Sequence, residues 1–179
     1  MPRRPTAKRY ALAAFEIARD SGQIEGWARD LQTAREALQD ETLRAYLELP
    51  KVTVERKTEG LRNALGGVNP LVVNLLALLT SRRSLGLLPR IVDGYQRLMD
   101  AHLNRERAEV ATAVPLEREQ GERLTQQLSQ LLGKEVILTS RVDPEVLGGL
   151  VARVGDKIID GSARGRLLAL RKSLTEVRG

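Results

Sequence analysis

The stretch of the chain that is richest in residues suited to chemistry is GGLVARVGDKIIDGSARGRLLAL, residues 148–170. Its glycines could cradle a phosphate, its aspartates could hold a divalent metal, and its basic residues could contact nucleic acid. The same residues could also build a β-hairpin that leads into a helix. Each of these functions requires its own spacing, so the sequence can be compared with each in turn.

The spacings do not fit a phosphate-binding or metal-binding loop. The chain has no G-x-x-x-x-G-K-[ST] motif, and Gly148-Gly149 leads into a strand pattern without the spacing of a dinucleotide-binding turn. Asp143, Asp156 and Asp160 do not follow the spacing of a calcium loop. The sequence therefore predicts no cofactor and no metal site.

Catalytic chemistry is also poorly supported. The absence of cysteine excludes disulfides, thiolate catalysis and thiolate metal ligation. The single histidine, His102, lies on an apolar helical face, which predicts a position in or beside the core. Because no strand–turn–helix signature places a nucleophilic serine, we predict no catalytic residues, and a small enzyme is the weaker hypothesis.

The stretch is more typical of a hairpin followed by a helix. Gly148-Gly149 would allow an unusual backbone or a close approach where a strand begins. Gly155-Asp156 suits a two-residue hairpin turn, and Asp160 or Ser162 would cap a closing helix. That helix would carry a basic stripe, which is more often a solvated face than a binding site: Arg164, Arg171 and Arg178.

The elements that would position these residues fall into two halves with different periodicity. Apolar residues recur at helical spacing throughout residues 1–105. After residue 105 the period changes, and stretches of strand-like alternation appear between helical ones. We expect an α+β fold, with an N-terminal six-helix bundle (1–105) followed by a small mixed β-sheet domain with two helices (106–179). The first half is expected to hold helices over 7–18, 24–38, about 41–48, about 53–64, from Pro70 onward, and 91–102. The second is expected to hold strands at 108–114, 135–142, 150–154 and 157–160, and helices over 117–132 and 163–177.

The charge of the chain leaves a second class of function open. The net charge is +6, and residues 1–105, with 17 basic and 12 acidic side chains, carry +5 of it. A basic nucleic-acid-binding protein is therefore the alternative, although only 5 aromatic residues are available for base stacking. No window approaches the roughly 18 apolar residues of a membrane span, and no signal peptide is recognisable, so we expect a soluble protein made where it works.

The C-terminal residues closely resemble the delta subunit (OSCP) family of the F-type ATP synthase. The family signature runs D-P-x-x-x-G-G, a short strand, and G-D-x-x-x-D-x-S-x-x-x-x-L. The opening helix AKRYALAAFEIA (7–18) and the Leu88-Pro89 landmark are also similar to the family, so the resemblance covers nearly the whole chain. The signature residues present here are Asp143, Pro144, Gly148, Gly149, Gly155, Asp156, Asp160, Ser162 and Leu167.

This resemblance implies a non-catalytic stator subunit. In such a subunit the N-terminal domain holds the N-terminal helix of an alpha subunit, and the C-terminal region holds the end of a b-type peripheral stalk. The joint stops the catalytic head from turning with the rotor, which couples proton-driven rotation to ATP synthesis. The resemblance further implies a mainly structural role for the signature residues. It places the protein at the cytoplasmic face of the bacterial plasma membrane, held there only through the complex, with no nucleic-acid partner.

The helix that includes residues 71–79 is the candidate for the head contact. It carries two adjacent apolar stripes, one of Leu71, Leu75 and Leu78 and one of Val72, Leu76 and Leu79. One stripe suffices for a core, so the other could face a partner or only widen the core. The alanine-rich opening helix would leave a shallow groove for a guest helix. Our hypothesis for the partner-binding residues is Tyr10, Ala14, Leu75 and Leu78.

Overall fold

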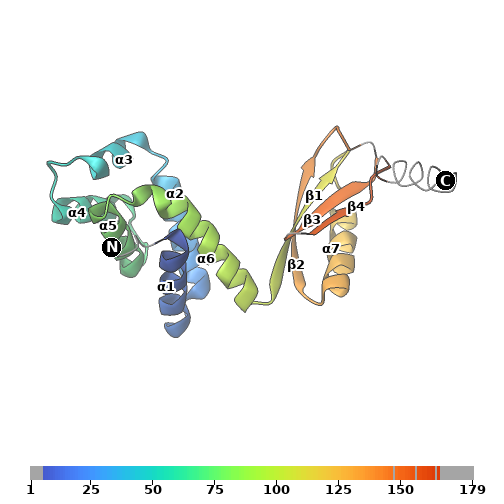
Figure 1. Cartoon of the computed structure of the whole chain (residues 1–179), viewed down its shortest axis with the longest axis horizontal. Coiled ribbons are helices and arrows are strands. Elements are labelled where there is room, and N and C mark those ends of the chain that lie inside the picture. Colours follow the sequence, from blue (N-terminus) through green and yellow to red (C-terminus); the bar gives the residue numbers. More distant parts are fainter. Residues whose placement is uncertain (1–5, 147, 156, 164, 166–179) are drawn as a thin grey trace, which may run out of the picture. The chain divides into compact units, whose positions relative to one another are not determined.

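The computed structural model describes residues 6–146, 148–155, 157–163 and 165 (Figure 1). The chain divides into two compact units, separated between Met99 and Asp100. Among the described residues, the first unit is helical, and the second contains a four-stranded sheet with a helix. The fold is therefore α+β, as predicted.

Helices account for the regular structure of the first unit, and several begin where the sequence places a cap. Asn69 Oδ1 accepts a hydrogen bond from Leu71 N at 2.9 Å, with Pro70 in the first turn. Asp40 accepts from two backbone N–H groups of the next helix, which hold the pKa of its carboxyl below the ordinary value. Thr6 occupies an N-cap position, but its side chain makes no capping hydrogen bond. The helices are α1 (Ala7–Asp20), α2 (Ile24–Ala37), α3 (Glu41–Glu48), α4 (Val54–Ala64), α5 (Pro70–Ser81), the short 3-10 helix η1 (Leu85–Leu87) and α6 (Leu88–His102).

The core of the first unit contains a close contact between α1 and α6. The rings of Phe15 and Tyr95 meet edge to face, with centroids 5.8 Å apart. Tyr95 Oη donates to the carbonyl oxygen of Ile24 at 2.8 Å, and burial raises the pKa of this phenol. A Cβ added at Gly94 would lie 2.9 Å from Ala11 Cβ, so the two helices approach as closely as small residues allow. The alanine-rich face of α1 is thus used for interior packing.

We predict that a fragment ending at Arg105 folds alone as a helical domain. Such a fragment retains all of α6, and the large buried side chains Trp27 and Ile91 belong to the first unit. A domain with its own core melts cooperatively, so circular dichroism should show a single sharp transition. A broad, non-cooperative melt would show that the helices depend on the second unit.

The second unit is built on a mixed sheet with strand order β2-β1-β3-β4. Strand β1 pairs in parallel with β2 and antiparallel with β3, and β3 pairs antiparallel with β4. Helix α7 connects the parallel pair, as a crossover connection between parallel strands must. The elements are β1 (Arg105–Thr112), α7 (Arg118–Leu132), β2 (Glu135–Val142), β3 (Leu150–Val154) and β4 (Lys157–Asp160).

Helix α7 lies against one face of this sheet (Figure 1). Leu128 packs with Ala108, Val136 and Val154, which come from three different strands. A capping box formed by Glu117 and Gln120 starts the helix, and Gly133 in the left-handed conformation ends it. The opposite face of the sheet has no helix of the described residues packed on it in this way.

Candidate binding surfaces

Metal-ligand clusters are absent from the part of the chain that the structure describes. No group of three or more His, Asp or Glu side chains in it could hold a metal ion. His102 is exposed, which corrects the expectation of a core or boundary position, because it is the last residue of α6 and lies beyond the buried turns. None of the described helices is both long and apolar enough to cross a membrane.

Most of the described signature residues meet at one end of the sheet, where β3 begins and β4 ends. Gly148 and Gly149 have φ angles of +76° and +77°, a left-handed region that favours glycine. A Cβ at Gly149 would overlap the carbonyl oxygen of Gly161 and lie 3.1 Å from Ser162 Cα. The second glycine is therefore required by the close approach of two backbone segments.

Side-chain hydrogen bonds hold the same end of the sheet together. Asp160 Oδ1 accepts from Ser162 N at 2.9 Å, and the buried Ser162 Oγ accepts from Gly165 N at 2.9 Å. At the end of β2, Asp143 Oδ1 accepts from Glu145 N at 3.1 Å. These carboxylates and this hydroxyl satisfy local backbone N–H groups.

Some of the predicted features lie elsewhere or cannot be placed. Gly155, with φ +55°, lies at the opposite end of the sheet, between β3 and β4. Two signature residues, Asp156 and Leu167, fall outside the described residues. The basic stripe of the expected closing helix also falls outside them: Arg164, Arg171 and Arg178.

Helix α5 carries the first candidate docking surface. Its inner stripe of Val72, Leu76 and Leu79 is buried. On the adjacent stripe, Leu71 is 47% exposed and Leu78 is 40% exposed, with the partly buried Leu75 between them. We call these three residues the leucine stripe. Large aliphatic side chains left half-exposed in a row are typical of a surface that a partner covers.

The two predicted partner-binding residues of α1 do not belong to this surface. Tyr10 is 9% exposed and Ala14 is 3% exposed, so neither side chain is available to a guest helix in this structure. This corrects the shallow groove expected around them, because the alanine-rich face of α1 packs into the interior of its own unit. The buried Tyr10 Oη has no hydrogen-bond partner among the described residues.

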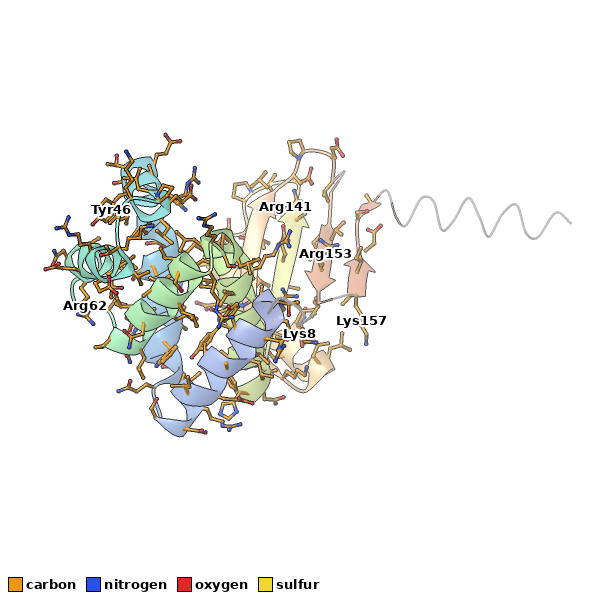
Figure 2. All side chains as sticks on the ribbon, turned by 60° about the vertical axis from the view of Figure 1, so that its left-hand side comes forward. Lys8, Tyr46, Arg62, Arg141, Arg153 and Lys157 are labelled. Carbon is orange, nitrogen blue, oxygen red and sulfur yellow. The ribbon has the colours of Figure 1, made fainter. Side chains whose placement is uncertain are left out.

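A second candidate surface is the sheet face opposite α7. Arg141 of β2 and Arg153 of β3, labelled in Figure 2, line a hollow of about 200 Å³ together with Val151 and Ile158. Arg141 pairs with Glu109 at 3.1 Å, and Ile158 is largely exposed. Sequence reasoning missed this surface, although the alternation along β2 and β3 places these residues opposite the buried ones. This sheet face combines exposed apolar groups with guanidinium groups.

The fold and these surfaces define a class of protein. A helical unit and a small mixed α/β unit each offer an amphipathic surface, and the described residues contain no metal-binding cluster. The chain is therefore a two-unit α+β protein with an exposed apolar surface on each unit.

The comparisons with known proteins specify the family. Residues 6–174 match the family described as the ATP synthase delta (OSCP) subunit, and the chain belongs to that family. It is 40% identical over 174 residues to the ATP synthase subunit delta of an Anaeromyxobacter species, covering 95% of this chain and 97% of the relative. It is 35% identical over 172 residues to that of Dehalococcoides mccartyi, covering 96% and 95%. A chain in the cryo-EM structure of the Toxoplasma gondii mitochondrial ATP synthase hexamer superposes with a TM-score of 0.68 at 27% identity, covering 96% of this chain and 98% of the other.

Proposed function

We propose that this chain is a non-catalytic stator subunit that links the catalytic head of the F-type ATP synthase to its peripheral stalk. Family membership supports the complex in which it works. The half-exposed leucine stripe is the single observation that carries the binding role, because a purely structural helix would have no reason to expose it.

In this proposal the N-terminal domain, residues 1–105, binds the N-terminal helix of an alpha subunit. The leucine stripe spans two turns of α5, which matches the apolar face of an amphipathic guest helix. The domain's net charge of +5 favours a guest with acidic flanks. Tyr10 and Ala14 would then support the surface from inside and would not contact the guest directly.

The C-terminal region, residues 106–179, binds the end of the b-type stalk in the same proposal. The sheet face opposite α7 offers an exposed isoleucine beside Arg153, while Arg141 is already paired with Glu109 and Asp143, and this apolar surface with a guanidinium group at its side fits an amphipathic acidic helix. The signature end of the sheet keeps β3 and β4 in register for that contact. The signature residues thus act as supports of the fold.

A joint of this kind must resist torque through every rotational step. Slow dissociation comes mainly from packed apolar anchors, since rim charges act chiefly on the association rate. The leucine stripe and Ile158 are suited to that task. The proposed place is the cytoplasmic face of the bacterial plasma membrane, where the protein is held only by its contacts within the complex.

A binding experiment tests both halves of the proposal. We expect the full chain to bind a fluorescein-labelled peptide of about 20 residues from the N-terminus of the cognate alpha subunit. A soluble C-terminal segment of the b subunit should bind at the same time and should not displace that peptide. Analytical ultracentrifugation would then show a ternary complex. Failure of either ligand to bind, or competition between them, would contradict the linking role.

A further inference from the structure

Two adjoining hollows in the first unit form a groove that the leucine stripe does not touch. One, of about 460 Å³, is lined by the end of α2, by α3 and by the start of α6. The other, of about 550 Å³, lies between α3, α4 and the end of α5. The two share Glu48, Leu85 and Gly86, and α3, which carries the labelled Tyr46 in Figure 2, forms one wall. Together we call them the α3 groove.

A lysine without a partner faces this groove. Lys57 of α4 is only 9% exposed, and its side chain lines the larger hollow. Its ammonium group makes no hydrogen bond or ion pair with any described residue. The buried part of this side chain is its aliphatic stem, which lysine often packs against apolar surface while its charged end stays in contact with water. An unpaired positive charge therefore lies at the edge of the groove, where an anionic group of a partner can reach it.

The backbone around Arg83 gives an independent observation. Arg83 has φ +51°, directly after α5. Ser84 N donates to Leu79 O at 2.8 Å and Arg83 N to Thr80 O at 3.0 Å, the pattern of a helix end that usually places glycine at this position. A non-glycine residue there is strained, and such strain is often found at binding sites. The Arg83 side chain lines the same hollow as Lys57.

The charges that line the groove do not balance. Arg44 lines the smaller hollow and, like Lys57 and Arg83, has no carboxylate partner among the residues that the structure describes. Arg35 also lines it but pairs with Asp93 at 3.1 Å. Glu48 is the only acidic side chain in the described lining of either hollow. Three cationic side chains without a carboxylate partner, Lys57, Arg83 and Arg44, thus share the lining with a single acidic side chain, Glu48.

We propose that the α3 groove binds an acidic, amphipathic segment of a partner protein, whose carboxylates pair with Lys57, Arg83 and Arg44. The cations are spread along two hollows instead of converging on one point, which favours an extended ligand over a single phosphate. Val52 and Val54 provide apolar lining for the uncharged side of the segment. This site does not depend on the proposed contact with the alpha subunit, because none of its residues belongs to the leucine stripe.

The test uses the full chain and a fluorescein-labelled helical peptide with a leucine/alanine face and a glutamate face. We expect saturable binding by fluorescence anisotropy, at least tenfold weaker for the double variant Lys57→Met with Arg83→Gly. Arg83→Gly relieves the backbone strain and Lys57→Met keeps an apolar stem in the buried position, so the melting temperature should not fall while affinity falls. A loss of affinity without a loss of melting temperature separates loss of binding from loss of folding.

The matched control is Arg56→Met with Arg82→Gln, which removes two exposed charges next to the same positions without touching the groove. Its affinity should stay within about twofold of the parent, since general charge attraction is reduced equally in both double variants. Equal weakening in both, or equal binding of a peptide with glutamine in place of glutamate, would overturn the proposal. Displacement of the peptide by millimolar phosphate or by phosphatidylglycerol vesicles would overturn it too, in favour of a small anion or a lipid surface.

Discussion

Gly149→Ala is expected to unfold the C-terminal unit, with a loss of about 4 kcal/mol in the free energy of unfolding. The new methyl group would overlap the carbonyl oxygen of Gly161 and press on Ser162 Cα, both of which are backbone atoms that cannot rotate away. The φ angle of +77° adds the strain of a left-handed alanine, roughly 1 kcal/mol. Relieving the overlap would require β3 and β4 to separate at this end.

Gly148→Ala provides the matched control for this prediction. Gly148 has nearly the same φ angle, +76°, but its added Cβ would lie 3.9 Å from Ala163 Cβ, an ordinary contact. It should therefore cost only the backbone strain, about 1 kcal/mol. Urea unfolding followed by amide NMR signals of the sheet measures both variants. Equal losses for the two would mean that strain alone, and not the close approach, explains the glycine doublet.

The helices of the first unit could be predicted well because their signals are local. The pair Asn69-Pro70 predicts the start of α5, and the helix expected over about 41–48 is α3, Glu41–Glu48. The alternation in residues 108–114 likewise predicts a strand, and β1 occupies Arg105–Thr112. The strand order β2-β1-β3-β4 and the parallel pairing of β1 with β2 could not be predicted, since pairing between distant segments leaves no mark in either segment alone.

The candidate sites were harder to predict than the helices. Periodicity shows that Tyr10 and Ala14 share a helix face, but it cannot tell whether the rest of the chain covers that face. For the same reason the two stripes of α5 looked alike, although only one of them is buried. The left-handed conformation of Arg83 could not be predicted, because its position lacks the glycine that usually marks such a helix end.

Because Ala14 is buried, a larger side chain at this position is expected to affect stability and not the binding of a partner. Ala14→Trp would force a large ring into the interior packing of α1, and it would destabilise the fold instead of blocking a guest helix. The variants that report on partner binding must therefore come from the exposed leucines of α5. Leu79, the buried neighbour on the same helix, shows the contrast, because Leu79→Asp would bury an unpaired charge and unfold the unit.

Leu78→Asp is expected to weaken binding of the alpha-subunit peptide about thirtyfold, which corresponds to about 2 kcal/mol, and to leave the fold intact. The side chain is 40% exposed, so the aspartate stays hydrated in the free protein and the melting temperature should change little. In the complex the same carboxylate would lose its water beneath an apolar guest face without gaining a partner. Leu71→Asp, on the same stripe, should act in the same direction.

Leu49→Asp is the matched control, because Leu49 is 48% exposed on the same unit but lies just after α3 and is not part of the leucine stripe. It introduces the same charge at similar exposure, so it corrects for any general repulsion of an acidic peptide. Titration of the labelled peptide against the parent, Leu78→Asp and Leu49→Asp, with thermal melts alongside, separates the possible outcomes. If Leu78→Asp binds like Leu49→Asp and melts like the parent, the guest helix does not lie on α5, and the stripe is exposed for another reason. If Leu78→Asp alone loses affinity while its melt is unchanged, the exposed leucines form the head contact.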